Sequence, residues 1–514
     1  MEKYASIFIL FLIISIIEGR RIPFIQSPYS VYSDLIKSSI DDFQFKDNST
    51  QVLWYTQTLD HFNFQNSQKT YQQRYVLNDQ YWDRPLSNST QCNGPILVYT
   101  GGEGDILWFY QNTQFVTETL AQEMNGLVLF IEHRYYGKSM PFGAYSGETD
   151  NLQYLSVEQA LADLAQLILY LQTQLNASHC PVLAFGGSYS GMVAAYFRMK
   201  YPNVVDGALA ASAPILYLPG LVDPEQYNII VTNDFRDTSE EGTCSSLILQ
   251  SLEYIQNSPE SDFDSLSETF SLCTPLETED DLDNLVGWIE SGLSYMSNTD
   301  YPYPSNFFEP LPGNPVNLSC SILTDYINQK GNSPQQLIEG LVEMIGIYFN
   351  YTGQSGSCYN TSNDVNPQLN ANNFNYQTCT EMVFPFASNG IQDMFPASPY
   401  NYSAIVEYCL ETFGIAPDPE WTITYFGGAN FQSSNIIFSN GQRDGWLAGG
   451  VIKSQVENNI YALVIEESPH HLDLRAPNPL DPPSVTKARS FETDILQQFS
   501  KEASLRKMIK HKNE

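Results

Sequence analysis

The stretch VLAFGGSYSGM, residues 182–192, decides the fold. A short apolar run that ends in glycines indicates a buried strand, and residues 192–199 continue in a pattern typical of a helix. A serine on a strained strand-to-helix turn projects its hydroxyl above a sheet, where a neighbouring base can activate it. We therefore expect Ser188 to be a nucleophile, although the pattern Gly-x-Ser-x-Gly ends here in Ser190, which is small enough to keep the turn.

Apolar runs and helical patterns alternate on both sides of this stretch. The expected strands cover residues 95–99, 127–131, 182–185, 435–438 and 461–465, and the expected helices cover residues 157–171, 192–199 and 485–499. Alternation of strands and helices predicts a parallel sheet with helices on both faces. The fold class is therefore α/β, with one hydrolase-like domain built from residues 50–215 and 425–510.

Residues 216–424 have a different composition. They are rich in Asn, Ser, Pro and acidic residues and hold six of the eight cysteines. Helical patterns at 247–255, 282–289 and 335–348 are separated by long polar connections. We interpret this region as a large, mainly helical cap, inserted into an α/β-hydrolase fold and stapled by disulfides.

A base and an acid for the serine follow the later strands. In this fold the catalytic residues occur in the order serine, acid, histidine. Asp444 lies just past the strand at 435–438, and His470 follows the strand at 461–465. The carboxyl ends of parallel strands form the edge where α/β enzymes bind their ligands. Ser188, Asp444 and His470 therefore form the candidate triad.

An oxyanion hole needs backbone N–H groups aimed at the developing charge. One is expected from Tyr189, directly after the nucleophile, and the other from the loop after the strand at 95–99, at Gly102. The glycines of this loop allow its backbone to approach the developing charge closely. Glu103, in the same loop, either meets a charged peptide terminus or braces the loop.

The charge and the N-terminus restrict the location and the partners. A formal net charge of -34 excludes nucleic acid and anionic membrane as partners, because both need a cationic surface. Lys3 precedes an apolar run at residues 7–17, and small Gly19 follows. This layout predicts a signal peptide over residues 1–19 and a secreted or lysosomal protein. An uncleaved signal anchor is the alternative, but the run is short for a membrane span.

Two further features agree with export. Eight cysteines, an even number, suit disulfides in an oxidising compartment, and no Cys-x-x-Cys or His-x-x-x-His spacing occurs, so neither a metal site nor a cofactor is expected. Seven Asn-x-Ser/Thr sequences predict glycosylation sites. They are Asn48, Asn88, Asn176, Asn317, Asn350, Asn360 and Asn401.

Several motifs together resemble one known family. They are QTLDHF at 57–62, YTGGEGD at 99–105, EHRYYGKS at 132–139, GALAASAP at 207–214, YQTCTE at 376–381 and HHLDLR at 470–475. With residues 186–192, they resemble the Pro-X carboxypeptidase and dipeptidyl peptidase II family of serine peptidases over nearly the whole mature chain. The resemblance implies peptide substrates, cleavage beside proline near a peptide end, and Ser188, Asp444 and His470 as nucleophile, acid and base.

The sequence departs from the family pattern near the expected proline pocket. Ser190 and Gly445 replace a usual glycine and proline, and Ser468-Pro469 replaces a Gly-Ala pair. Motif position makes four apolar residues candidates for the pocket, with ordinary core packing as an equal alternative for each. They are Met192, Met382, Phe384 and Trp446.

The predicted disulfide pairs rest on two different arguments. The resemblance implies three pairs within the cap, Cys379–Cys409, Cys244–Cys320 and Cys273–Cys358. Cys92 and Cys180 each precede a strand, at 95–99 and 182–185, and these strands are neighbours in an α/β-hydrolase sheet. Two cysteines at the same end of adjacent parallel strands lie within disulfide reach. We therefore predict a Cys92–Cys180 bond.

The sequence leaves the exopeptidase mode open. Release of a C-terminal residue after proline and release of an N-terminal dipeptide both use the same triad. An esterase or lipase on this fold is the alternative enzyme class, but its lid is usually apolar, whereas this cap is acidic and polar. A binding protein without activity would need a broken triad. Nothing in the sequence decides the pH optimum, or between a monomer and a homodimer.

Overall fold

The computed structural model describes residues 45, 49–65, 68–86, 92–354, 356–361 and 371–513. The predicted signal peptide, residues 1–19, lies outside them. Within this part of the chain, no helix is long and apolar enough to cross a membrane.

The centre of the molecule is a single eight-stranded sheet with the order β1-β2-β4-β3-β5-β6-β7-β8. The first two strands pair antiparallel with each other, β2 pairs antiparallel with β4, and all remaining pairs are parallel. The strands are β1 (Thr50–Thr58), β2 (Thr70–Asn78), β3 (Ile96–Tyr99), β4 (Leu127–Ile131), β5 (Val182–Gly187), β6 (Gly207–Ala211), β7 (Ile436–Gly441) and β8 (Ile460–Ile465). The five predicted strands are present, whereas β1, β2 and β6 were not predicted.

Alternate residues of the central strands enter different cores. In β3, Leu97 and Tyr99 belong to one apolar cluster, whereas Ile96 and Val98 belong to the other. Successive side chains of a strand point to opposite faces, so a strand buried on both faces is apolar throughout. This is why β3, β4 and β5 have continuous apolar sequences, and it confirms the α/β fold class.

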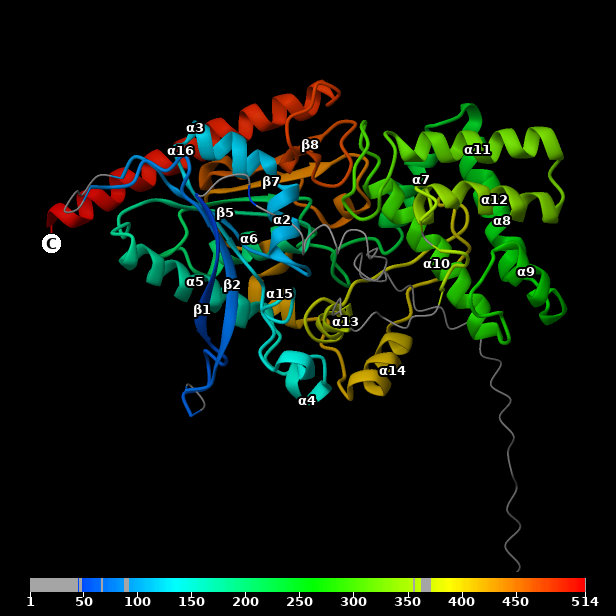
Figure 1. Cartoon of the computed structure of the whole chain (residues 1–514), viewed down its shortest axis with the longest axis horizontal. Helices are drawn as coiled ribbons and strands as arrows, with labels where there is room; N and C mark the ends of the chain where they lie inside the picture. The colour runs from blue at the N-terminus through cyan, green and yellow to red at the C-terminus, as the bar shows by residue number, and fades with distance from the viewer. Residues whose placement is uncertain are drawn as a thin grey trace, which may run out of the picture.

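Helices cover both faces of the sheet. Helix α6 packs on β5 and β6 and contacts α5, and these helices share a cluster with one face of the strands. The long C-terminal helix α16 contacts β5, β6 and β8 and contributes to the other cluster. Figure 1 shows α5 and α16 on opposite sides of the sheet. The helices of this part are α2 (Ile106–Asn112), α3 (Ala121–Glu123), α4 (Thr149–Leu152), α5 (Val157–Gln174), α6 (Tyr189–Lys200) and α16 (Pro483–Asn513).

The other α-helices of the described residues lie between β6 and β7 in the sequence. They are α7 (Gln226–Arg236), α8 (Thr243–Gln256), α9 (Phe263–Thr269), α10 (Glu279–Asn298), α11 (Pro315–Lys330), α12 (Pro334–Phe349), α13 (Ala371–Thr380), α14 (Tyr402–Phe413) and α15 (Trp421–Phe426). Figure 1 shows α7 to α12 gathered together at the right, beside the sheet, and α13 to α15 below it. This is the segment in which a helical cap was predicted.

The cap and the sheet share a continuous core. Side chains of α8, α10 and α12 belong to the same apolar cluster as one face of β3 to β7. Helix α10 begins with a capping box, in which Thr278 accepts from the Asp281 N–H and the Asp281 carboxylate accepts from the Thr278 N–H. The opposite end of α10, at Asn298, reaches the loop that carries His470.

Candidate active site

Ser188 stands on the sharp turn between β5 and α6. Its φ is 59°, which is rare for a residue other than glycine. The turn is held on both sides, since the Ser188 N–H donates to the Ala211 carbonyl at 3.0 Å and the Ser188 carbonyl accepts from the Met192 N–H at 3.0 Å. The serine therefore stands at the carboxyl edge of the sheet, with its conformation fixed by β6 and α6.

The backbone around this turn is packed too closely for larger residues. A Cβ on Gly186 would lie 2.1 Å from the Ser190 carbonyl oxygen, and one on Gly187 would lie 2.8 Å from the His471 ring. A Cβ on Gly102 would lie 2.2 Å from the Ser190 hydroxyl oxygen. The turn thus forms although position 190 is serine, because Gly102 has no side chain and leaves room for the Ser190 hydroxyl.

His470 and Asp444 are joined by a hydrogen bond beside the serine turn. His470 Nδ1 lies 2.8 Å from Asp444 Oδ2, and both side chains are buried. Asp444 follows β7 and also accepts from the Trp446 N–H at 3.1 Å. With Nδ1 donating to a carboxylate, the other ring nitrogen, Nε2, is left as the proton acceptor.

The cap fixes the loop that carries His470. The His470 N–H donates to the Asn298 carbonyl at 3.0 Å, and the Tyr301 hydroxyl donates to the His470 carbonyl at 3.0 Å. Asn298 ends α10, and Tyr301 follows it closely in the chain. The position of the base therefore depends on residues of the cap as well as on β8.

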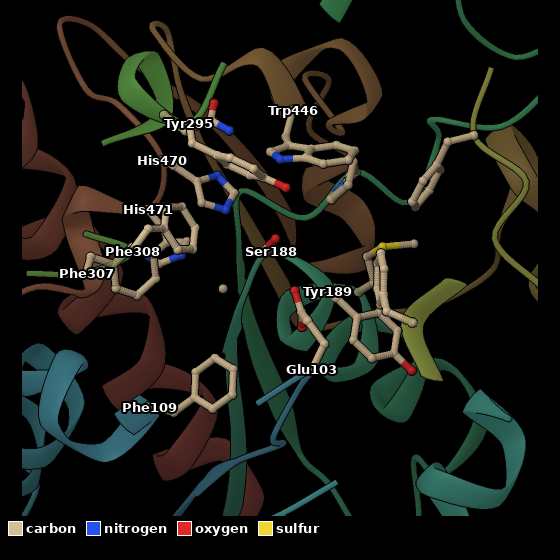
Figure 2. Close-up of a pocket in the computed structure, with 16 residues that line it drawn as sticks. Glu103, Phe109, Ser188, Tyr189, Tyr295, Phe307, Phe308, Trp446, His470 and His471 are labelled. Carbon is tan, nitrogen blue, oxygen red and sulfur yellow. The ribbon is translucent and has the colours of Figure 1, made fainter. Parts of the chain in front are cut away.

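Ser188 and His470 line the same cavity. Figure 2 shows the Ser188 hydroxyl between the His470 ring and the Glu103 carboxyl. Much of the remaining wall is aromatic. These aromatic residues include Phe109, Tyr295, Phe307, Phe308, Phe374, Phe384 and Trp446.

Two glycines hold the predicted oxyanion loop against the sheet. Gly101 has a φ of 67°, and a Cβ there would lie 2.3 Å from the Ile131 carbonyl oxygen. Gly102, next to it, lies against Ser190. The predicted oxyanion loop therefore lies directly against the serine turn.

A buried polar network holds the Tyr189 side chain. Its hydroxyl lies 3.0 Å from His133 Nε2 and accepts from Gln377 Nε2 at 2.7 Å. Gln377 also donates to Glu381 at 2.8 Å and accepts from the Tyr136 hydroxyl. Burial lowers the pKa of His133 to about 4, so this ring stays neutral. The sequence motifs contained His133, Tyr136, Gln377 and Glu381, but no role for these four residues was predicted.

His471, next to the predicted base, was also not assigned a role from the sequence. Its ring centroid lies 4.3 Å from that of His470, and its N–H donates to the Ser212 hydroxyl at 2.9 Å. Burial and the neighbouring His470 and Arg475 lower its pKa well below the usual value. His471 therefore remains neutral beside the base and adds no charge to the cavity.

Four of the five residues predicted for the substrate pocket line the cavity. Glu103, Met192 and Trp446 are in its wall, as is Phe384. Met382 is instead buried in the apolar cluster that contains Met192 and lies outside the cavity wall. Tyr295, Phe307 and Phe308 were not predicted, because no local pattern marks them and only the packing of the cap brings them to Ser188.

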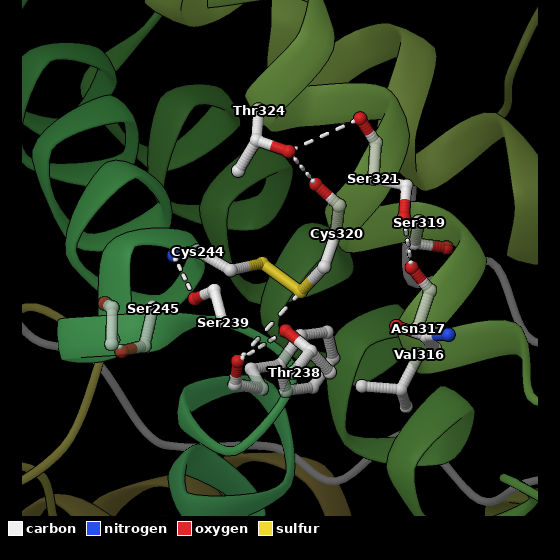
Figure 3. Close-up of a disulfide and its surroundings, with 12 residues drawn as sticks. Thr238, Ser239, Cys244, Ser245, Val316, Asn317, Ser319, Cys320, Ser321 and Thr324 are labelled. Atoms are coloured by element: carbon white, nitrogen blue, oxygen red, sulfur yellow. Dashed lines mark hydrogen bonds between the residues drawn. A yellow bond between two sulfur atoms is a disulfide. The ribbon is translucent and has the colours of Figure 1, made fainter.

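The structure contains the four disulfides that were predicted. Parallel pairing of β3 with β5, with Ile96 opposite Val182, places Cys92 and Cys180 at the same end, with their Cα atoms 5.1 Å apart. The Cys244–Cys320 bond joins α8 to α11 (Figure 3). The remaining pairs are Cys273–Cys358 and Cys379–Cys409.

None of the five predicted glycosylation sites that the structure describes lies in the cavity wall. Asn48 and Asn88 fall outside the described residues. Asn176, Asn317, Asn360 and Asn401 are exposed, and Asn350 is half-buried. Among the described residues, no group of three or more His, Cys, Asp or Glu side chains is arranged to hold a metal ion.

Comparison with known proteins identifies close relatives. Residues 57–492 match the family model for serine carboxypeptidase S28. The chain is 42% identical to the lysosomal Pro-X carboxypeptidase of Homo sapiens, with 87% of this chain and 88% of the relative covered. It is 41% identical to the Bos taurus protein of that name, with 90% and 92% covered. It is 34% identical to the prolyl carboxy peptidase like protein 5 of Caenorhabditis elegans, with 86% and 89% covered.

Proposed function

Because the chain belongs to the serine carboxypeptidase S28 family and is a serine-type peptidase, we propose that it is a proline-selective exopeptidase with Ser188, Asp444 and His470 as its triad. The observation that carries the proposal is the 2.8 Å hydrogen bond from His470 Nδ1 to Asp444, in the wall of the cavity that Ser188 also lines. The order of the three residues along the chain is that of the α/β-hydrolase fold.

The proposed reaction has two halves. His470 Nε2 takes the proton of the Ser188 hydroxyl as the serine oxygen attacks the scissile carbonyl, and Asp444 stabilises the imidazolium that forms. The N–H groups of Tyr189 and Gly102 bind the oxyanion. The imidazolium then gives its proton to the departing amine, which leaves an acyl-enzyme. Water, deprotonated by His470, attacks this ester and releases the peptide acid and the serine.

The cavity wall supports selection of proline. The proline ring is compact and apolar, and Met192, Phe384 and Trp446 offer an apolar surface of that kind. Phe384 and Trp446 contact each other edge to face, with ring centroids 5.5 Å apart. Trp446 is placed by its backbone bond to Asp444, so the pocket and the triad are positioned together.

We favour release of the C-terminal residue that follows proline. The named relatives at 41–42% identity are Pro-X carboxypeptidases and cover most of this chain. Release of an N-terminal dipeptide uses the same triad and is the outcome that would refute this choice. We also propose a lysosomal or secreted location, which the lysosomal relatives, four disulfides and exposed glycosylation sequences support.

The test uses two peptide types and two histidine variants. We expect the purified protein to cleave an N-blocked X-Pro-Y peptide and to leave a free-amine X-Pro-reporter peptide intact. Ser188→Ala and His470→Gln should each abolish cleavage. His61→Gln is the matched control, because His61 forms a second buried pair, 2.7 Å from Asp163, that does not line the cavity.

The outcomes separate the parts of the proposal. Cleavage of the free-amine peptide alone would refute the carboxypeptidase mode. Activity that survives Ser188→Ala would refute the triad. Equal losses in His470→Gln and His61→Gln would show that the effect of the first variant is structural.

A further inference from the structure

The Glu103 carboxyl is an unpaired acid in the wall of the cavity. Its residue is only 6% exposed, and Oε2 is buried without a hydrogen-bond partner among the described residues. Figure 2 shows the carboxyl pointing toward Ser188. A buried polar atom without a partner costs free energy, so its retention in a substrate cavity indicates a partner that arrives with the substrate.

No lysine or arginine in the described part of the cavity wall balances the charge of Glu103. The ionisable hydroxyls that face the carboxyl belong to Tyr99 in β3, Tyr136 after β4, Tyr189 in α6 and Tyr295 in α10. Burial raises the pKa of all four, so they are neutral at any working pH.

Two histidines and one arginine are the remaining titratable or charged groups to consider near Glu103. His470 and His471 line the same cavity, and the lowered pKa of His471 keeps that ring neutral. Arg475 donates to the Asn112 side chain at 2.7 Å, and its guanidinium lies 3.6 Å from the centroid of the Phe307 ring. It is therefore engaged behind the wall.

In this buried site the Glu103 carboxyl holds its proton at acidic pH and can then donate a hydrogen bond. Burial raises the pKa of its carboxyl to about 7, opposed only by a bond with its own backbone N–H. A protonated carboxyl has one O–H to donate. A peptide with a free C-terminus brings a carboxylate into a cavity whose described wall has no lysine or arginine, and such a charge needs a hydrogen-bond donor there.

We propose that the Glu103 carboxyl donates a hydrogen bond to the C-terminal carboxylate of the substrate and thereby selects peptides with a free C-terminus. This inference rests on the carboxypeptidase function proposed above. No proton is transferred when the substrate binds. The Glu103 carboxyl keeps its O–H and donates it as a hydrogen bond to an oxygen of the substrate carboxylate. Above the pKa of Glu103 the two groups are both negative and repel each other, so binding of a free C-terminus weakens while the triad stays intact.

The test compares one N-blocked X-Pro-Y peptide as the free acid and as the C-terminal amide, from about pH 4.5 to 8. For the wild type, we expect KM for the free acid to rise above about pH 7, the pKa of Glu103, and KM for the amide to stay flat. Glu103→Leu should raise KM for the free acid by about tenfold to one-hundredfold, the range for a charge-assisted hydrogen bond, and leave the amide unaffected. Glu103→Gln keeps an uncharged donor and should remove the rise at high pH.

Glu309→Gln is the matched control. Glu309 is also buried, with its pKa raised to about 8, but it does not line the cavity. It should behave as the wild type. Reaction of Ser188 with a serine-directed fluorophosphonate probe reports separately whether each variant has an intact triad.

Three other results would each contradict a specific part of this inference or of the proposed function. Equal losses on the acid and the amide in both Glu103 variants would show that Glu103 only braces the loop. A wild type that hydrolyses both peptides with the same KM at every pH would overturn the inference alone. A wild type that cleaves only free-amine peptides would overturn the carboxypeptidase function and the inference together.

Discussion

Two buried acids beneath the catalytic loop predict a stability that falls as the pH rises. Asp473, in the short helix Leu472–Leu474, follows His470 by three residues, and Glu492 lies on α16. Both side chains are buried. Burial and the neighbouring Asp473 raise the pKa of Glu492 well above its usual value. Burial also raises the pKa of Asp473.

The same region ties α16 to the catalytic loop. Arg489, also on α16, donates to the carbonyls of Leu472 and Asp473, at 2.8 Å each, and to Asp481. The Ser439 hydroxyl at the end of β7 donates to Asp473 at 2.5 Å. Loss of the proton from Glu492 would place two negative charges together at this junction, and a single arginine would have to offset them.

The direction of this pH dependence follows from whether the folded or the unfolded protein binds the Glu492 proton more tightly. The pKa of Glu492 is higher in the folded than in the unfolded protein, so its contribution to stability is fully present below about pH 4.3, the unfolded value. The contribution falls as the pH rises toward the folded pKa, by about 1.4 kcal/mol for each pH unit. Between about pH 4.5 and 7.5 the loss reaches at most roughly 4 kcal/mol.

Glu492→Gln tests this by replacing the acid with a neutral amide of the same shape. We expect the variant to be more stable than the wild type at about pH 7.5, by roughly 1–4 kcal/mol, and to lose that advantage at about pH 4.5. The measurement is urea unfolding at several pH values, with disulfides intact. Glu502→Gln is the control, because Glu502 is a solvated acid on the same helix that accepts from Gln498.

The reasoning would be refuted by a difference between Glu492→Gln and wild type that does not change with pH. It would also be refuted if Glu502→Gln changed the pH dependence equally. Either result would mean that Glu492 does not hold its proton in the folded protein.

Two further predictions concern close packing and the disulfide. Gly102→Ala should lower kcat strongly, because its Cβ would lie 2.2 Å from the Ser190 hydroxyl oxygen, and adding Ser190→Gly should restore part of the loss. Steady-state kinetics check this, and a double variant no better than Gly102→Ala would contradict it. Replacing Cys92 and Cys180 with alanine should lower the free energy of unfolding by about 3–5 kcal/mol, since the bond closes a loop with a sequence separation of 88. Denaturant unfolding measures this, and an unchanged midpoint would contradict it.

Local patterns predicted much of the sheet and pointed to the three residues of the proposed triad. Strands β3, β4 and β5 are apolar throughout because both faces are buried, and such runs can be recognised without tertiary information. Strand β6 was missed because its glycine and alanines are a weak strand signal, although it supports the serine turn through Ala211. Strands β1 and β2 were missed in a polar stretch whose pairing is set by the neighbouring strand β4.

The sequence by itself determined which residues at the strand ends are candidates for catalysis. Ser188, Asp444 and His470 each follow a strand or turn signal that is local in the chain, so their roles could be inferred from their order. Only the tertiary structure decided what encloses them. Tyr295, Phe307 and Phe308 reach the cavity because the cap packs on the sheet, and Met382 is excluded from its wall for the same reason. Such contacts join residues more than a hundred positions apart, and their energy depends on the shape of the whole core.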